Sequence, residues 1–157
     1  MRRAIPILAV LVLAVSPARA EKADREKPTQ IEANRMSADD VKRMTIFEGN
    51  VILTKGTIAV RAERGAVSPN GEEIFLYDNV VLVREADQER PEARLTTSFL
   101  HVLRERNLVR TDREVLIVED TRSLSGRGME YDNESRVFTL MADVRGRYEP
   151  KSLEPKK

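Results

Sequence analysis

Apolar and polar residues alternate along most of the chain between residues 28 and 150. Over residues 57–63, for example, Ile58, Val60 and Ala62 fall on one side of an extended chain, and charged residues fall on the other. A period of two with many β-branched residues is typical of half-buried β-strands. We therefore expect an all-β domain.

Residues that favour turns divide these alternating segments. Asn70-Gly71 is the strongest signal, because a type I′ hairpin turn needs positive φ at both central positions. The stretch from Ser37 to Met44 is the only helix-like one. It is short and charged, so we expect a turn or a connection between strands there. The other predicted turns are Gly49-Asn50, Lys55-Gly56, Gly65, residues 87–91, Thr111-Asp112 and Asp132-Asn133.

A faint internal repeat accompanies the alternation. Val51, Val80, Val115 and Val144 each begin or lie in an apolar strand at similar spacings, and each directly follows an acidic residue or Asn. Each unit reads as a strand, a turn, a second alternating strand and another turn. Such units cannot bury an apolar face alone, so the repeat favours a stacked β architecture.

The first twenty residues have the order of parts of a secretory signal. Arg2 and Arg3 precede an apolar run over residues 5–15, and Ala-Arg-Ala at 18–20 is a small-x-small cleavage site. The apolar run is too short to cross a bilayer core of about 30 Å. We expect residues 1–20 to be a cleavable signal peptide that directs the protein to the periplasm; the alternative is an uncleaved membrane anchor.

The remaining chain has room for one domain. We expect a flexible lead-in at 21–27, a single β domain at 28–150 and a disordered tail at 151–157. Of the 27 basic residues, three lie in the signal segment, which has no acid, so the secreted chain would carry 24 basic and 26 acidic residues, a net charge of −2. This balance gives no electrostatic footprint for nucleic acid.

Residues that could carry chemistry are few. The chain has no Cys, which excludes disulfides and thiolate sites, and His101 is its only histidine. No nucleophile or orienting acid lies near His101 in sequence, so a structural or surface role in a strand is expected. The acidic pairs at 39–40, 72–73 and 119–120 adjoin turn signals and read as solvated. We expect no catalytic residue, no metal site and no cofactor, and therefore no enzyme.

Two short motifs have ordinary structural interpretations. Gly126-Arg127-Gly128 lacks the third glycine and the following helix of a phosphate-binding loop, so a bend within a strand is expected. Asn133-Glu134-Ser135 matches a glycosylation acceptor pattern, but in a bacterial export context it reads as a hairpin turn.

Two segments near the start carry a family resemblance. The sequence Pro-Thr-Gln-Ile-Glu-Ala at 28–33 and the Gly-Asn-Val and Gly-Thr-Ile strands within 47–58 resemble the lipopolysaccharide transport family, the LptA/LptC group with the OstA-like fold. The start is similar to the LptA members. The remainder, including 60–66, 74–83 and 125–150, is similar to the LptC members.

The resemblance implies a β-jellyroll, or β-taco, of two antiparallel sheets that is open at both ends. Members of this family use no cofactor. They shield the acyl chains of lipopolysaccharide between the sheets and associate end to end into a bridge across the periplasm.

The apolar side of the alternating strands is the candidate lipid site. It would shield the lipid A acyl chains, whereas the alternative is a structural β-repeat or scaffold module in which the same residues form a dry core. The candidate groove-lining residues are Ile31, Phe47, Val51, Leu53, Ile58, Val60, Ala62, Phe99, Phe138 and Leu140.

The two ends of the sheet are candidate protein interfaces. An open edge presents unpaired backbone groups, so a strand of the next protomer can continue the sheet. We expect an N-terminal edge at 29–36 and a C-terminal edge at 136–147, joining other Lpt bridge components or further copies of the chain head to tail. The candidate interface residues are Thr29, Ile31, Ala33, Val137, Thr139 and Met141.

Overall fold

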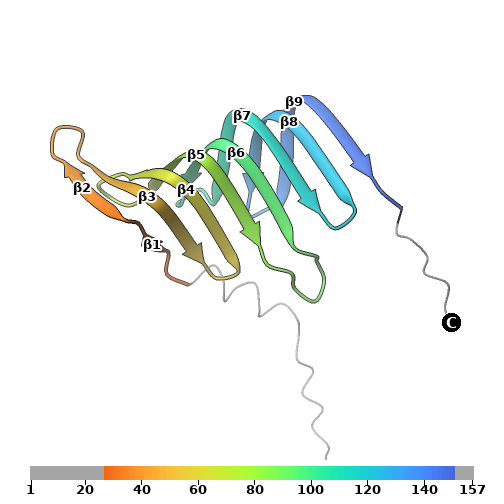
Figure 1. The fold of residues 1–157 in the computed structure, drawn as a ribbon, viewed down its shortest axis with the longest axis horizontal. Helices are drawn as coiled ribbons and strands as arrows, with labels where there is room; N and C mark the ends of the chain where they lie inside the picture. The colour runs from red at the N-terminus through yellow and green to blue at the C-terminus, as the bar shows by residue number, and fades with distance from the viewer. Residues whose placement is uncertain (1–26, 151–157) are drawn as a thin grey trace, which may run out of the picture.

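The structure is a computed structural model that describes residues 27–150, and every regular element in that range is a β-strand (Figure 1). The prediction of an all-β domain is confirmed. The predicted signal peptide and tail, and most of the lead-in, lie outside the described residues. Between residues 27 and 150 there is no helix that could span a membrane. The strands are β1 (Gln30–Glu32), β2 (Arg35–Asp39), β3 (Met44–Lys55), β4 (Ile58–Val67), β5 (Glu73–Arg84), β6 (Ala93–Leu103), β7 (Leu108–Glu119), β8 (Arg122–Asp132) and β9 (Val137–Tyr148).

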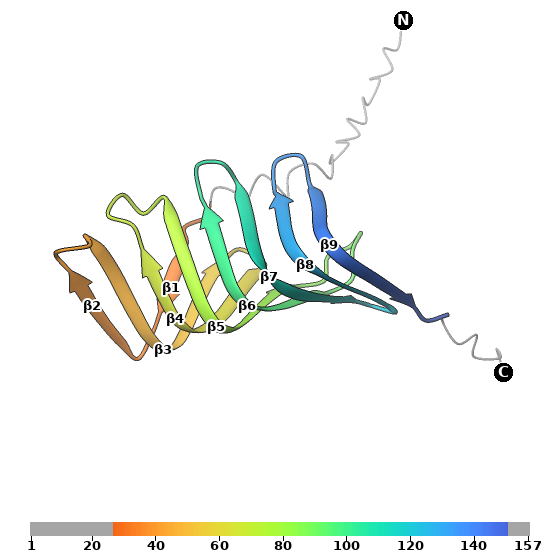
Figure 2. The same cartoon turned by 90° about the horizontal axis from the view of Figure 1, so that it is seen from above.

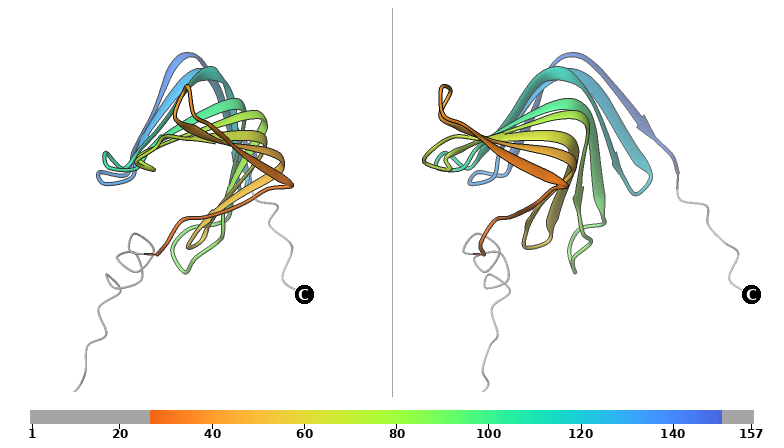
Figure 3. Two further views of the ribbon diagram at one scale, coloured as in Figure 1. Left: turned by 90° about the vertical axis from the view of Figure 1, so that its left-hand side faces the viewer. Right: turned by 60° about the vertical axis from the view of Figure 1, so that its left-hand side comes forward.

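The strands form one antiparallel sheet, in which each strand from β3 to β9 pairs with the next along the chain. The short strands β1 and β2 both pair with β3, at its two ends. Figure 2 shows β2 and β9 at opposite ends of the sheet. The two antiparallel sheets that we expected are the two halves of this one sheet, which is folded over on itself (Figure 3).

The fold of the sheet runs through a line of β-bulges. The pairing register shifts near the middle of every long strand, and residues in the left-handed region mark the place, among them Asn50, Asn79 and Asp143. A bulge bends and twists its strand, so aligned bulges bend the whole sheet. We call the two halves half-sheet I (44–48, 64–67, 73–77, 99–103, 108–111, 129–132 and 137–140) and half-sheet II (51–55, 58–61, 80–84, 93–97, 114–119, 122–125 and 145–148).

This bend explains the valine repeat. Val51, Val80 and Val144 each directly follow a left-handed residue, and Val115 follows the register shift between Thr111 and Glu114. The four valines therefore occupy the same place in β3, β5, β7 and β9, immediately after the bend. One repeat is a pair of adjacent bent strands.

Three predicted turns lie inside strands and were wrong as turns. Gly49-Asn50 is a bulge in β3, Gly65 lies within β4, and Thr111-Asp112 lies at the bend of β7. The residue types that tolerate left-handed backbone in turns also occupy bulges. The signals at Lys55-Gly56 and Asp132-Asn133 do mark connections between strands.

The loop around Asn70-Gly71 joins β4 to β5 as predicted, but it is not a two-residue type I′ turn. Only Gly71 has a positive φ, of 72°. The amide of Gly71 donates to the carbonyl of Ser68 at 2.8 Å, while Asn70 Oδ1 accepts from Ser68 Oγ and from the amide of Glu72. Side-chain hydrogen bonds thus shape a longer loop at 68–72.

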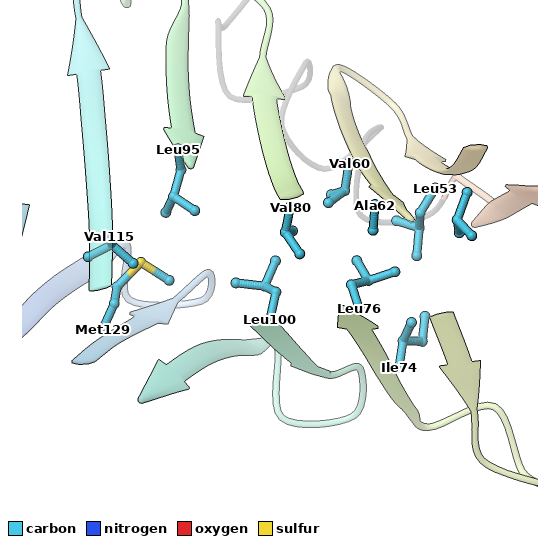
Figure 4. Packing of buried hydrophobic residues seen from close by; sticks show 11 residues of the cluster. Leu53, Val60, Ala62, Ile74, Leu76, Val80, Leu95, Leu100, Val115 and Met129 are labelled. Atoms are coloured by element: carbon cyan, nitrogen blue, oxygen red, sulfur yellow. The ribbon is translucent and has the colours of Figure 1, made fainter. Parts of the chain in front are cut away.

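The core lies between the two half-sheets. Figure 4 shows Leu76 and Leu100 of half-sheet I pointing toward Val80 and Ala62 from the facing strands. Leu76, Leu100 and Val80 are almost completely inaccessible to solvent. Burying these side chains is the main stabilising contribution that the bend makes possible.

Candidate functional site

The candidate site is the inner face of the folded sheet, meaning the side that the two half-sheets turn toward each other. On half-sheet II, one register row crosses six strands with only apolar side chains. Backbone pairing aligns these residues, because in-register positions of neighbouring strands point to the same side. The row consists of Leu53, Val60, Leu82, Leu95, Ile117 and Leu124.

Half-sheet I supplies the facing rows. One register row contains Phe47, Leu76 and Leu100, with Gly65 between Phe47 and Leu76. Farther along the row, Met129 on β8 pairs with Leu140 on β9. The next row outward contains Ile74, Val102, Val109, Tyr131 and Phe138.

Most of the predicted groove-lining residues share this inner face. Val51, Leu53, Val60 and Ala62 are buried members of the core cluster. Ile31, Phe47, Ile58 and Leu140 are partly buried and pack against that cluster. The partly buried residues are therefore the ones that a ligand can reach.

The two remaining predictions have different outcomes. Phe138 is paired with Tyr131 in an inner row and keeps 37% of its surface exposed on the last strand. Phe99 does not join the inner face: its ring lies 5.2 Å from that of Tyr77, and both alternate with the buried residues Leu100 and Leu76. The prediction for Phe99 was wrong because the alternation that begins at Leu95 and Thr97 is interrupted by the register shift between Thr97 and His101, which puts Leu100 on the inner face instead.

The predicted groove-lining set lacks central members of the face. Five of these, from Ile74 to Leu100, alternate with polar or outward residues in the segments 74–82 and 93–100, so their signal was present in the sequence. The omitted buried residues are Ile74, Leu76, Val80, Leu95, Leu100, Val115 and Met129.

A charged row borders the inner face at the outer margin of half-sheet II. Arg84 Nη2 lies 3.8 Å from Glu119 Oε2, and Arg122 Nη2 contacts Glu119 Oε1 at 2.5 Å. These three residues are in register beyond the apolar row. Apolar surface therefore ends at a polar rim on this side.

The predicted interface positions lie at the two ends of the sheet. Ile31 is in β1, flanked by Thr29 and Ala33, while Val137, Thr139 and Met141 are in β9. Ile31 and Ala33 pack against the core. Val137 and Met141 expose 56% and 58% of their surface. Among the described strands β9 pairs only with β8, so its other edge has no strand beside it. The interface role of these positions remains a prediction.

His101 lies in β6 on the outer side of half-sheet I. Its ring stacks on Phe75 with centroids 4.4 Å apart, and Arg110 Nε donates to His101 Nδ1 at 3.2 Å. The Nε2 atom is 3.5 Å from Glu73 Oε1 and has no hydrogen-bond partner. Burial, followed by repulsion from Arg110, lowers the pKa of His101 below its usual value. These contacts fit the structural role expected for this histidine.

Two cavities lie away from the inner face. One of about 630 Å³ is lined mainly by charged and polar residues at the ends of half-sheet I, including Arg43, Glu73 and Arg110. Another of about 420 Å³ is lined by residues such as Pro91 and Arg94. Within residues 27–150, no three acidic or histidine side chains gather as a metal site would require.

Comparison with known proteins assigns the chain to a family. A family model described as lipopolysaccharide-assembly, LptC-related matches residues 43–149. The lipopolysaccharide export system protein LptA of Escherichia coli K12 is 41% identical over 69 residues, which are 43% of this chain and 37% of that protein. The LptA protein of Haemophilus influenzae is 35% identical over 68 residues, covering 43% of this chain and 40% of that protein. The match thus spans about two fifths of the length of these relatives.

The fold itself has a solved counterpart. LptH, the LptA-homologous periplasmic component of the lipopolysaccharide transport device of Pseudomonas aeruginosa, superposes with a TM-score of 0.70 at 14% identity, covering 81% of this chain and 99% of that structure. Both group names expected from the sequence, LptA and LptC, occur among the matches. The chain belongs to the lipopolysaccharide-assembly, LptC-related family.

Proposed function

We propose that the protein is a non-enzymatic periplasmic component of lipopolysaccharide transport, which shields lipid A acyl chains against its inner face. The observation that carries the proposal is the apolar inner face, continuous in register from β3 to β8 and extended on β9 by Phe138 and Leu140. The family assignment and the names of the LptA relatives support it.

The chemistry of the face suits such a ligand. Acyl chains gain about 0.8 kcal/mol for each methylene removed from water, without any directional bond. An aliphatic surface therefore accepts chains of different length and number. The same surface is lined almost entirely by aliphatic and aromatic side chains, which supports a carrier over a hydrolase.

Access separates the candidate residues into two sets. Val51, Leu53 and Val60 already have their surface covered by neighbouring side chains. Ile58 and Leu140 are partly exposed at the margins of the face, where an acyl chain can contact them without unpacking the core. We expect the lipid to bind along these margins.

We further propose that the protein forms part of a bridge by pairing of edge strands. The free edge of β9 would pair with the N-terminal edge near 29–36 of the next protomer, either another Lpt component or a second copy. Such a head-to-tail contact is heterologous and can propagate. Exposed Val137 and Met141 would become buried in the joint.

Export is also a proposal. Cleavage after Ala20 would make Glu21 the first residue of the periplasmic protein. Amino-terminal sequencing of periplasmic material tests this directly. Retention of residues 1–20 in a membrane fraction would indicate an anchored component instead.

Site-specific photo-crosslinking tests the lipid proposal. A photoreactive side chain at Ile58 or Leu140 is expected to capture lipopolysaccharide, whereas one at Arg61, an exposed position between the buried residues Val60 and Ala62, is not. Equal labelling at all three positions would contradict the assignment of the inner face as the lipid site.

A structural module with a dry core is the second candidate function. It is favoured by the close packing of Val51, Leu76 and Leu100, which already bury one another. Lipid analysis of the purified protein separates the two functions. A scaffold would carry no lipopolysaccharide and would give no crosslink at Ile58 or Leu140.

A further inference from the structure

The outer side of half-sheet II has a composition that the proposed lipid site does not explain. Its outward positions on β3, β5 and β7 are mostly apolar, and Ile52, Val81 and Leu116 lie in one register row. Leu116 and its strand neighbour Val118 expose 46% and 40% of their surface. Large aliphatic side chains are thus presented to solvent on the side of the sheet opposite the core.

Arginines occupy the outward positions between and beside these apolar strands. Arg61 on β4 is paired with Val81, and Arg94 on β6 lies in register with Val118. Arg145 and Arg147 hold the same two rows on β9. We call these two rows, which run from residues 52 and 54 on β3 to residues 145 and 147 on β9, the basic outer face.

The basic outer face contains no acidic residue in either row. Both rows can be followed through the pairing register across seven strands, and their other members are Val83 and residues of the types Thr, Ser and Ala. Among residues 27–150, Arg147 pairs with Glu149 at 2.9 Å, just beyond the strand, whereas no ion pair is formed by Arg61 or Arg145. Glu92 and Asp120 line a cavity with Arg94 at the margin of the face, so the uncompensated positive charge within the two rows is that of Arg61 and Arg145.

The outer side of half-sheet I provides the contrast. There, Arg64 Nη2 pairs with Asp78 Oδ2 at 2.8 Å, and Arg35 Nε lies 3.5 Å from Glu48 Oε2. Acids and bases balance one another on that side, as expected for a surface that faces only water. The one-signed charge belongs specifically to half-sheet II.

We propose that the basic outer face docks on the surface of an anionic phospholipid bilayer. Guanidinium groups bind phosphate oxygens in a bidentate manner, and their aliphatic stems can lie along neighbouring apolar residues while the charge stays among the headgroups. Leu116 and Val118 would enter the boundary between headgroups and acyl chains. The inner face would then carry lipid while the outer face holds the protein at a membrane.

A fluorescent probe at Leu116 tests the docking. The chain has no Cys, so Leu116→Cys can be labelled at one position with a polarity-sensitive dye. Vesicles of phosphatidylethanolamine and phosphatidylglycerol should shift its emission to the blue, while phosphatidylcholine vesicles should not. The matched control is Glu130→Cys, an exposed position on the outer side of half-sheet I. Both variants retain the rest of the full chain, so any contribution of its ends is the same.

The arginines are tested by a charge-matched pair of variants. Arg94→Gln with Arg145→Gln should weaken binding to the phosphatidylglycerol vesicles about 10- to 30-fold, whereas Lys42→Gln with Arg106→Gln, at exposed turn positions, should leave it unchanged. Equal shifts at Leu116 and Glu130, or equal losses in the two double variants, would overturn the proposal. So would a Leu116 response to polyglutamate without one to vesicles, because that result would assign the face to an acidic protein.

Discussion

Val80 and Val144 hold equivalent positions directly after the bends of β5 and β9, yet Val80 is fully buried and Val144 exposes 55% of its surface. Each follows a left-handed residue, Asn79 and Asp143 respectively. The difference arises from their neighbours. The strand β5 has a partner on both sides, whereas β9 has a described partner on one side only. The last repeat therefore ends in an apolar position that a further strand would cover.

The first prediction concerns these two valines. Val80→Ala should lower the free energy of unfolding by about 2 kcal/mol, because it removes two buried methyl groups and leaves a cavity. Val144→Ala deletes the same atoms from an exposed site and should change it by less than about 0.5 kcal/mol in the monomer. Urea denaturation of both variants at low protein concentration measures the difference. Equal losses would mean that Val144 is covered within the monomer.

The second prediction concerns the left-handed residue at the bend of β5. Asn79 has φ of 48°, and its side-chain amide donates to Glu63 Oε1. Asn79→Val should destabilise the fold by about 1–2 kcal/mol relative to Asn79→Gly, because both variants lose the hydrogen bond and only valine is strained in the left-handed region. Thermal or urea unfolding of the two variants checks this. Equal stability would show that the bulge does not require left-handed backbone at this position.

The third prediction compares two glycines in the sheet. A Cβ atom at Gly126 would lie 3.1 Å from the carbonyl oxygen of Ala142, on the neighbouring strand. At Gly65 the nearest atoms are 3.4 Å away and belong to the side chains of Leu76 and Val51. We expect Gly126→Ala to cost about 1–3 kcal/mol of unfolding free energy through overpacking and Gly65→Ala to cost clearly less. The reverse order would contradict the close approach of β8 and β9.

The fourth prediction concerns His101 and the pH dependence of stability. Burial and Arg110 keep the pKa of His101 below its usual 6.5, while Glu73 opposes them. The unfolded chain then binds more protons than the folded one below pH 6.5, so this contribution to stability is present above that pH and is lost as the pH falls. His101→Gln should weaken the dependence of unfolding free energy on pH between about pH 8 and about pH 5.

The control for this prediction is the exposed residue Lys42→Gln, which should leave the pH dependence as in the unmodified chain. Urea denaturation across the pH range gives the comparison. A steeper loss of stability toward low pH in His101→Gln than in the unmodified chain would contradict the sign of the effect.

The last prediction concerns the free edge of β9. Neighbouring backbone N–H groups of a strand point to opposite edges, so Phe138→Pro and Thr139→Pro remove donors on different sides of β9. One variant should lose a bond to β8 and unfold more easily. The other should keep its stability but lose the head-to-tail oligomers, because the missing donor lies on the joining edge.

Sedimentation measures the oligomers, and circular dichroism confirms that the sheet persists in each variant. Oligomers that persist in the proline variant with unchanged stability would contradict the assignment of β9 as a joining edge. Loss of oligomers only in the destabilised variant would do the same.

The local part of this structure was available from the sequence. Strict alternation at 57–63 placed Ile58 and Val60 on one face, because the side-chain period of a strand is fixed by its own backbone. The Gly-Asn-Val and Gly-Thr-Ile strands gave the family, which the match over residues 43–149 confirms. These features depend on near neighbours along the chain.

The bend and the faces were decided only by pairing between strands. Gly49-Asn50 and Asp132-Asn133 carry similar turn residues, but the first is a bulge inside β3 and the second begins a hairpin connection. A left-handed residue bends the chain in either case, and whether the strand continues depends on the partner strand beside it. Phe99 lies on the outer side for the same reason. Its place follows from its pairing with Tyr77, a residue far from it in the sequence.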